Sequence, residues 1–217
     1  MISTREVRVV FGGTVALSAI DLELGSGIVG LFGPNGSGKT TLLRVLTGLL
    51  PPTSGEVLYD GAPLDLRDEA QRRMLGYAGH SSGLYDTFTV RENLELFARL
   101  YGAVGRVPHV IEALALTEVA GTRVGHLSAG WVRRAAVARA MVHDPQMLLL
   151  DEPYANLDDD ASDIVSNAIR AWHSPGRTAV IATHGAKRVR AYADAGVVLR
   201  RGEVASARSS FATPEPV

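Results

Sequence analysis

The sequence contains no cysteine, so every kind of site that needs a thiol is excluded. Disulfides, thiolate metal sites and cysteine nucleophiles cannot form, and a reducing compartment is compatible with the chain. Lysine is almost as scarce, because Lys39 and Lys187 are the only lysines among 22 basic residues. Any chemistry must therefore come from other groups, and a lysine at a functional position stands out.

Blocks of like charge and long apolar runs are missing as well. The net charge is −1 and the charged residues are spread along the chain, which argues against a nucleic-acid surface. The longest apolar stretches, such as 28–32 and 147–150, fall far short of the roughly 20 residues that span a bilayer. The N-terminal residues lack the basic start and apolar core of a signal peptide. We therefore expect a cytoplasmic chain that makes no membrane span and binds no nucleic acid.

The pattern that is present is that of a mixed α/β protein. A chain of 217 residues with 46% apolar content can form one domain with a sizeable core. Gly12 and Gly13 separate two strand-like segments, which is typical of an antiparallel hairpin. An apolar strand then enters a glycine-rich loop, and a helical segment follows until two prolines stop it. These first elements are expected at 7–10, 15–24, 28–32 and 40–50.

The rest of the chain first shows helical periodicity and then alternates helices with strands. Helical spacing is expected at 90–100 and 110–116, a helix at 128–143, a strand at 147–150, a helix at 159–172, and strands at 178–182 and 197–199, the last one. This order predicts an α/β fold with a mostly parallel core sheet, an antiparallel N-terminal β subdomain and a helical insertion over about 86–145. We expect a single domain over 1–205 and a loose tail over 206–217.

The clearest motif is a phosphate-binding loop at residues 33–40. It matches G-x-x-x-x-G-K-[ST] and lies between a predicted strand and a predicted helix, which predicts a P-loop NTPase that uses ATP and Mg²⁺. Backbone N–H groups and the helix N-terminus would bind phosphate oxygens, Lys39 would reach the β- and γ-phosphates, and Thr40 would bind Mg²⁺. The alternative is a glycine-rich turn with a surface lysine. The candidate nucleotide-binding residues are Gly33, Pro34, Asn35, Gly36, Ser37, Gly38, Lys39, Thr40 and Thr41.

Two adjacent carboxylates follow the apolar strand at 147–150. They would lie at the carboxyl edge of a parallel sheet, where ligands bind. Side chains alternate along a strand, so the two carboxylates are expected to differ in role: Asp151 would hold Mg²⁺, and Glu152 would act as the general base on the water that attacks the γ-phosphate. The alternative is a solvated strand end, and the preceding phosphate-binding loop argues against it.

A second candidate anion site lies at Leu127-Ser128-Ala129-Gly130, just before a predicted helix. Ser128 is a natural N-cap, and the helix N-terminus favours an anion. This run resembles the signature motif of the ABC ATPase family, and the motifs before and after it follow the order of that family. The resemblance covers the chain from about residue 6 to residue 204 and implies the ABC cassette form of the P-loop NTPase fold.

The resemblance implies that two cassettes pair head to tail, so that Ser128 and Gly130 of one cassette bind the γ-phosphate held by the other. It also implies that Asp158 lies in the loop at the dimer seam and that His184 contacts the γ-phosphate, where it would assist Glu152 and Lys39 in catalysis. Phe11 is similar to the aromatic residue that stacks on adenine. From the residues alone, His184 could instead be a surface or capping histidine, and Phe11 a core residue at a strand end.

Two positions depart from the family pattern. His80 stands where most members have a glutamine that positions water and metal, and Trp131 stands where a glutamine commonly closes the signature motif. We expect His80 to contribute to the metal site. The alternative is that His80 lies in a loop and contacts only a membrane subunit.

The run from Gly79-His80 to residue 94 resembles the ATP-binding subunit of the cytochrome c maturation haem exporter. The resemblance implies an ATP-hydrolysing subunit, peripheral on the cytoplasmic face of the membrane, that pairs with a second cassette, expected to be another copy of itself, and with integral membrane subunits. The expected task is export, with haem as one cargo. Alternatives are the ATPase of a drug, lipid or polysaccharide exporter, a non-transport ABC ATPase, or a non-hydrolysing ATP-binding module. Glu152 and His184 argue against the last.

Overall fold

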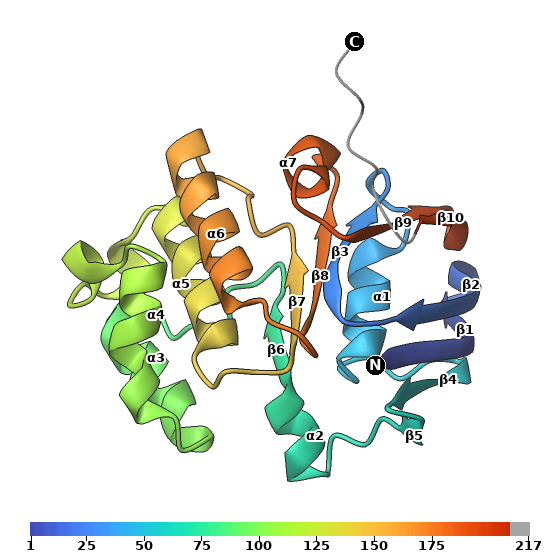
Figure 1. The fold of residues 1–217 in the computed structure, drawn as a ribbon, viewed down its shortest axis with the longest axis horizontal. Helices are drawn as coiled ribbons and strands as arrows, with labels where there is room; N and C mark the ends of the chain where they lie inside the picture. The colour runs from blue at the N-terminus through green and yellow to red at the C-terminus, as the bar shows by residue number, and fades with distance from the viewer. Residues whose placement is uncertain (209–217) are drawn as a thin grey trace. The chain divides into compact units, whose positions relative to one another are not determined.

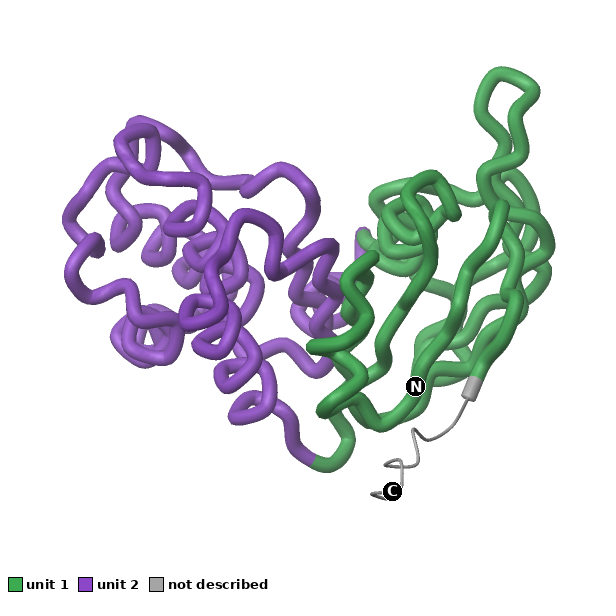
Figure 2. Tube along the Cα trace, turned by 90° about the horizontal axis from the view of Figure 1, so that it is seen from above, with its two compact units in different colours: residues 1–66, 175–217 green, residues 67–174 purple. Residues whose placement is uncertain are grey.

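The structure is a computed structural model that describes residues 1–208. The chain divides into two compact units, coloured separately in Figure 2. The first unit comprises Met1–Leu66 and the chain from Pro175 onward, and the second comprises Arg67–Ser174. The second unit is larger than the helical insertion expected over 86–145, because two strands and two further helices belong to it.

An antiparallel sheet with the strand order β2-β1-β4-β5 forms one part of the first unit (Figure 1). Strands β1 (Ile2–Phe11) and β2 (Thr14–Leu24) pair across Gly12 and Gly13, whose φ angles of 50° and 85° suit a tight hairpin turn. The predicted hairpin is therefore confirmed. Strands β4 (Ser54–Tyr59) and β5 (Ala62–Pro63) complete the sheet and were not among the predicted elements.

A second sheet of the first unit is built around β3 (Gly27–Phe32). It pairs in parallel with β8 (Thr178–Thr183) and with β9 (Ala195–Arg200). All residues of β3 and β8 are buried, which explains their continuous apolar runs. Helices α1 (Lys39–Leu46) and α7 (Ala186–Arg190) belong to the same unit. The largest fully buried side chains here are Ile2, Leu17, Ile20, Leu31, Leu42, Leu43 and Leu46.

Two sequence-based boundaries of the first unit are corrected by the structure. Helix α1 ends at Leu46 rather than at 50, because Gly48 has a φ of 68° and provides a left-handed residue just after the end. Strand β9 is not the last strand, because β10 (Glu203–Arg208) pairs with it in antiparallel. The tail expected from 206 therefore begins with three strand residues, and its remainder, 209–217, lies outside the described residues.

The second unit combines two parallel strands with helices. Strands β6 (Leu75–Ala78) and β7 (Met147–Asp151) pair in parallel, and the residues of β7 are all buried. The helices are α2 (Glu69–Met74), α3 (Val90–Leu100), α4 (Val107–Ala113), α5 (Ala129–Met141) and α6 (Asp159–Trp172), with 3₁₀ turns at Val104–Arg106, Thr117–Val119 and Val124–His126. Helices α3 and α6 have the predicted bounds, whereas α2 was not predicted.

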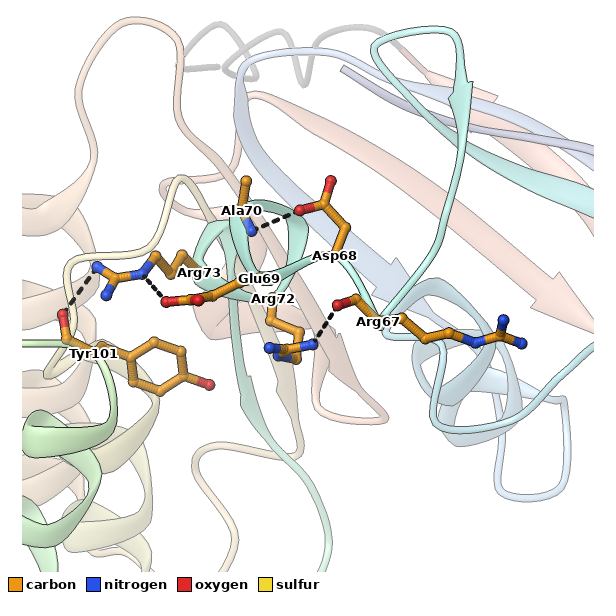
Figure 3. Close-up of polar contacts among 7 residues, drawn as sticks. All are labelled: Arg67, Asp68, Glu69, Ala70, Arg72, Arg73 and Tyr101. Carbon is orange, nitrogen blue, oxygen red and sulfur yellow. Dashed lines mark hydrogen bonds and ion pairs between the residues drawn. The ribbon is translucent and has the colours of Figure 1, made fainter.

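The start of β6 is held by polar contacts from α2 and from the end of α3. Arg73 pairs with Glu69 (Nε to Oε1, 3.2 Å) and donates to the carbonyl oxygen of Tyr101 (3.0 Å), as Figure 3 shows. The Tyr101 ring stacks on His143 at 4.3 Å, and His143 Nε2 donates to the carbonyl oxygen of Leu75 (2.9 Å). These contacts fix the strand that leads to Gly79 and His80.

Within residues 1–208, no helix combines the length and apolar character that a membrane crossing requires.

Candidate functional site

The phosphate-binding loop of the first unit follows the buried strand β3 and ends in α1. A Cβ atom at Gly33 would lie 2.3 Å from the carbonyl oxygen of Leu199, and one at Gly38 would lie 2.9 Å from that of Ala16. Both glycines also have positive φ angles, 152° and 105°. The loop backbone therefore packs directly on neighbouring strands of its own unit, and only glycine fits at these two positions.

Lys39 is buried within this loop, with 6% of its surface exposed. Its Nζ donates to the carbonyl oxygens of Gly33 (2.8 Å) and Pro34 (3.1 Å), so the side chain reaches back across the loop. The first N–H groups of α1 lack intrahelical partners and lie at the positive end of the helix dipole. The loop thus combines a buried ammonium with backbone donors, which is the chemistry that binds a polyphosphate. The alternative of a surface lysine is wrong for Lys39, whereas Lys187 is exposed.

Ser37 adds a buried hydroxyl group to the same loop. Its side chain is part of a residue only 2% exposed, and its Oγ has no hydrogen-bond partner in the described part of the chain. The backbone of Ser37 is fully used, because its N–H donates to Pro34 (3.2 Å) and its carbonyl accepts from Gly202 (3.0 Å). Buried hydroxyls normally have partners, so the orphaned Oγ fits a loop that binds a ligand rich in acceptors. Thr40, the predicted Mg²⁺ ligand, is exposed on the first turn of α1.

Two further predicted residues of the first unit lie at strand ends. His184 is exposed and directly follows Thr183, whose register partner is Phe32 at the end of β3. The loop that starts at Gly33 and His184 therefore leave the sheet at the same carboxyl edge. Phe11 ends β1 and is 50% exposed, so the alternative of a core residue is wrong. Its stacking on adenine stays a prediction.

The second unit carries the two predicted carboxylates at the end of β7. Asp151 is 2% exposed and Glu152 is half-buried, which agrees with the expected difference between neighbouring positions. Glu152 has a φ of 49°, in the left-handed region that non-glycine residues avoid. Backbone strain of this kind is concentrated at functional sites.

Within residues 1–208, no three His, Cys, Asp or Glu side chains gather to hold a metal ion. A single carboxylate with a hydroxyl and phosphate oxygens is the ligand set that suits Mg²⁺.

The predicted signature residues are brought together at the start of α5. Ser128 is the N-cap of α5, yet its hydroxyl makes no capping hydrogen bond. A Cβ atom at Gly130 would lie 3.1 Å from the carbonyl oxygen of Asn156, so the helix start packs closely on that loop. Asp158 caps α6 by accepting from the Ala161 N–H (2.8 Å). The three predicted residues line one pocket of about 400 Å³, whose lining includes Ser128, Gly130, Trp131, Arg134, Asn156 and Asp158.

The two departures from the family pattern are also placed by the structure. The Arg134 guanidinium lies 3.8 Å from the centre of the Trp131 ring, a cation–π contact that holds the indole at the pocket of the signature residues. His80 is exposed and lines a different pocket, of about 240 Å³, together with Ser82 and Arg133. A Cβ atom at the preceding Gly79 would lie 2.6 Å from the Tyr77 hydroxyl oxygen, so a larger residue there would require the Tyr77 ring to move.

Sequence reasoning missed Arg133, which contacts both strand ends of this unit. Its side chain is buried and donates to the main-chain carbonyl oxygens of Gly79, Asp151 and Glu152. A signal was available, because an arginine at this position falls on the side of α5 that also carries the buried Ala136 and Ala140. The partners themselves could not be read from the sequence.

Comparison with known proteins places these motifs in one family. The sequence matches the family model described as ABC transporter over residues 17–155. Nod factor export ATP-binding protein I of Cupriavidus metallidurans is 37% identical over 190 residues, which are 85% of this chain and 63% of that protein. ABC transporter ATP-binding protein NatA of Bacillus subtilis is 33% identical over 192 residues, 86% of this chain and 78% of that protein. The chain thus spans less than two thirds of the first of these relatives.

Solved structures agree in fold over nearly the whole chain. The ATP-binding cassette MJ0796, in a dimeric post-hydrolysis state bound to ADP and Pi, is 26% identical with a TM-score of 0.87. That match covers 98% of this chain and 100% of the other. Another dimeric structure of MJ0796, described as a bacterial ABC transporter cassette, is 27% identical with a TM-score of 0.86. The predicted α/β cassette fold is therefore confirmed.

Proposed function

The chain belongs to the ABC transporter family and has an ABC ATPase domain, and we propose that it hydrolyses ATP as one cassette of a two-cassette machine that powers export across a membrane. The observation that carries the proposal is the buried Lys39, whose ammonium is held 2.8 Å from the Gly33 carbonyl oxygen inside a loop of glycines with positive φ. This arrangement binds a nucleotide polyphosphate.

Each candidate residue has a distinct task in this proposal. Lys39 and the first N–H groups of α1 bind the β- and γ-phosphates as a point charge and as directional donors. Thr40 and Asp151 are the residues that would hold Mg²⁺, which when bound neutralises phosphate charge as hydrolysis proceeds. Glu152 accepts a proton from the attacking water, and His184 donates a hydrogen bond to a γ-phosphate oxygen. Phe11 presents an exposed ring for the adenine base.

The second cassette is proposed to be another copy of this chain. Ser128, Gly130 and Asp158 line one pocket, and the hydroxyl of the N-cap Ser128 makes no capping hydrogen bond. This surface therefore offers N–H and O–H donors to an anion from outside the unit. The solved dimers of MJ0796 support pairing of cassettes of this fold. Integral membrane subunits are the proposed partners for transport, with the chain peripheral on the cytoplasmic face.

The direction and cargo of transport are proposed from the resemblance and from the relatives. The resemblance of the run at 79–94 implies haem as the cargo, and the alternatives are the cargoes of a drug, lipid or polysaccharide exporter. Relatives from Cupriavidus metallidurans and a Rhizobium species are named for Nod factor export, which favours a polysaccharide exporter over haem export. We therefore propose an export ATPase whose cargo belongs to the polysaccharide or lipid class, with haem as the rival.

The decisive experiment compares the two lysines. Lys39→Ala removes the ammonium from the phosphate-binding loop and is expected to reduce ATP turnover by about 100-fold or more. Lys187→Ala changes an exposed lysine of α7 and is expected to leave turnover unchanged. Phosphate release from the purified chain measures both. Equal turnover of Lys39→Ala and the parent would contradict the proposal.

The transport part has its own test. The chain is purified from mild-detergent extracts, the co-purifying membrane subunits are identified by mass spectrometry, and haem is measured by its absorbance. Membrane subunits of an exporter without haem support the proposed class. Stoichiometric haem would favour the rival cargo, and absence of any membrane subunit would favour a non-transport ATPase.

A further inference from the structure

The side chain of Arg133 joins two strand ends that are far apart in the sequence. Its Nη1 donates to the carbonyl oxygen of Gly79 (2.7 Å), just after β6. Its Nε donates to the carbonyl oxygen of Glu152 (3.0 Å), and its Nη2 donates to the carbonyl oxygens of Asp151 and Glu152. The residue is only 7% exposed. One guanidinium therefore donates to main-chain carbonyl oxygens at the ends of both β6 and β7.

The chemistry of arginine suits this task, and that of lysine does not. A guanidinium is a planar group with five N–H donors in fixed directions, so it can serve several carbonyl oxygens at once. A lysine ammonium is a compact group on a flexible stem and cannot reproduce this geometry. The carboxylates of Asp151 and Glu152 also act on Arg133: burial lowers the pKa of the guanidinium, and these two charges oppose that effect. The group thus lies in the field of both carboxylates.

The backbone that Arg133 holds is the strained part of the site. Glu152 has a φ of 49°, a conformation that persists only where the surroundings enforce it. The carbonyl oxygen of the same residue, Glu152, accepts two hydrogen bonds from Arg133. On the other side, Gly79 immediately precedes His80, and His80 and Arg133 line the same pocket of about 240 Å³. Loss of the guanidinium would free both segments at once.

We propose that Arg133 is a positioning residue for ATP hydrolysis, which holds the Glu152 carboxylate and the His80 segment in their working geometry. The proposal rests on the proposed function, in which Glu152 accepts the proton of the attacking water. Arg133 lies on the second turn of α5, whose N-cap is Ser128. Arg133 therefore connects this helix to the Glu152 backbone by hydrogen bonds.

A matched control is available on the same helix. Arg139 of α5 is half-buried, and its guanidinium donates to the carbonyl oxygen of Tyr77 (2.7 Å) and lies 4.9 Å from the centre of the Phe97 ring. It contacts the middle of β6 and makes no hydrogen bond to the strand ends at Gly79 and Glu152 among the contacts of the described residues. Arg133→Met and Arg139→Met therefore remove similar groups from one helix, and only the first releases Glu152.

Steady-state kinetics and nucleotide binding form the first test. In Arg133→Met, kcat is expected to fall by about 10-fold to 100-fold, while the affinity for ATP changes by less than about 3-fold, because the loss affects the geometry of the general base rather than the phosphate-binding loop. Arg133→Lys is expected to recover only part of kcat. Arg139→Met should keep kcat per folded molecule within about 2-fold of the parent, even if its Tm falls as much as that of Arg133→Met.

Hydrogen exchange measured by mass spectrometry provides a readout that does not depend on activity. Exchange of the segments 79–82 and 152–157 should rise in Arg133→Met but not in Arg139→Met. Arg133→Lys should show the same rise, and it replaces Arg133→Met in this comparison if Arg133→Met folds poorly. Combined with Glu152→Gln, the Arg133→Met change should cause no further loss of turnover, because both act through the same carboxylate.

The outcomes separate this proposal from the proposed function. Unchanged exchange of both segments in both Arg133 variants would overturn it, and so would equal losses of kcat in Arg133→Met and Arg139→Met. A parent chain without any ATPase activity would overturn the proposed function instead, and the exchange comparison would still decide whether Arg133 holds the two segments.

Discussion

Phe32 and Thr183 are register partners at the ends of the parallel strands β3 and β8. The next residue after Phe32 is Gly33, the first residue of the phosphate-binding loop, and the next after Thr183 is His184. Two candidate phosphate-binding segments that are about 150 positions apart in the sequence thus leave one sheet at neighbouring points of its carboxyl edge. This pairing gives His184 a structural reason to act with Lys39, because both segments belong to the same unit.

The first prediction concerns Glu152→Gln, which should keep ATP binding and lose turnover by about 100-fold or more, since an amide has the shape of the carboxylate but cannot accept the proton. Bound ATP should then hold two cassettes together. Light scattering with ATP and Mg²⁺ measures the dimer, and phosphate release measures turnover. Glu112→Gln, on the exposed side of α4, is the control and should behave like the parent. A strictly monomeric Glu152→Gln chain, with no other cassette bound, would contradict the two-cassette arrangement.

The second prediction tests His80 as a residue that positions water and metal. His80→Ala should lower turnover and raise the Mg²⁺ concentration needed for half-maximal activity, whereas His80→Gln should restore both, because an amide oxygen can accept the hydrogen bonds of the imidazole nitrogen. Mg²⁺ titrations of ATPase activity check this. Identical titrations for His80→Ala and the parent would favour the alternative, in which this exposed residue only contacts a membrane subunit.

The third prediction concerns the exposed ring of Phe11. Phe11→Ala should weaken ATP binding by about 10-fold with little effect on kcat, since stacking of an aromatic ring on a base contributes roughly 1–3 kcal/mol. Phe11→Tyr should bind like the parent. Leu49→Ala removes another exposed apolar side chain of the same unit, 54% exposed against 50% for Phe11, and should have no effect. Fluorescence titration with an ATP analogue distinguishes these variants, and unchanged affinity in Phe11→Ala would show that the base binds elsewhere.

The fourth prediction concerns the N-terminus of α3, where Thr89 and Glu92 form a capping box. Thr89 Oγ1 accepts from the Glu92 N–H (3.1 Å), and a Glu92 carboxylate oxygen accepts from the Thr89 N–H (2.8 Å). Thr89→Ala should therefore lower Tm by about 3 °C, as expected for loss of an N-cap. Thermal unfolding followed by circular dichroism measures the shift. Thr87→Ala, at an exposed position nearby, is the control and should leave Tm unchanged.

The same capping box predicts a pH dependence of stability. The hydrogen bonds from Thr89 lower the pKa of Glu92, so the folded state favours the charged carboxylate. The stabilising contribution of Glu92 is therefore fully present above its usual pKa of about 4.3 and is lost as the pH falls through the lower pKa of the folded state. The Tm difference between the parent and Glu92→Gln should shrink below about pH 4.3. A difference that stays constant down to pH 3 would contradict this linkage.

Local patterns in the sequence were sufficient for the phosphate-binding loop and for several elements. The spacing of glycines with Lys39 and Thr40 marks the loop, because only this order of residues provides both the backbone turns and the cation. Helix α3 has the predicted bounds because Thr89 provides its cap and an apolar stripe its buried face. Strands β4 and β10 were missed because neither shows apolar alternation: the buried residues of β4 form one short run at its end, and the residues of β10 whose burial is described are mostly exposed.

Other features were decided only by the tertiary structure. Sequence alone established which residue types could bind phosphate and metal, since side-chain chemistry and local backbone preference are encoded in short runs. It could not show that Phe32 pairs with Thr183, because register depends on packing between distant segments. Nor could it show that Arg133 donates to the carbonyl group of Gly79, 54 positions away. A main-chain carbonyl is the same at every residue, so a hydrogen bond to it leaves no pattern in the sequence and exists only once the chain has folded.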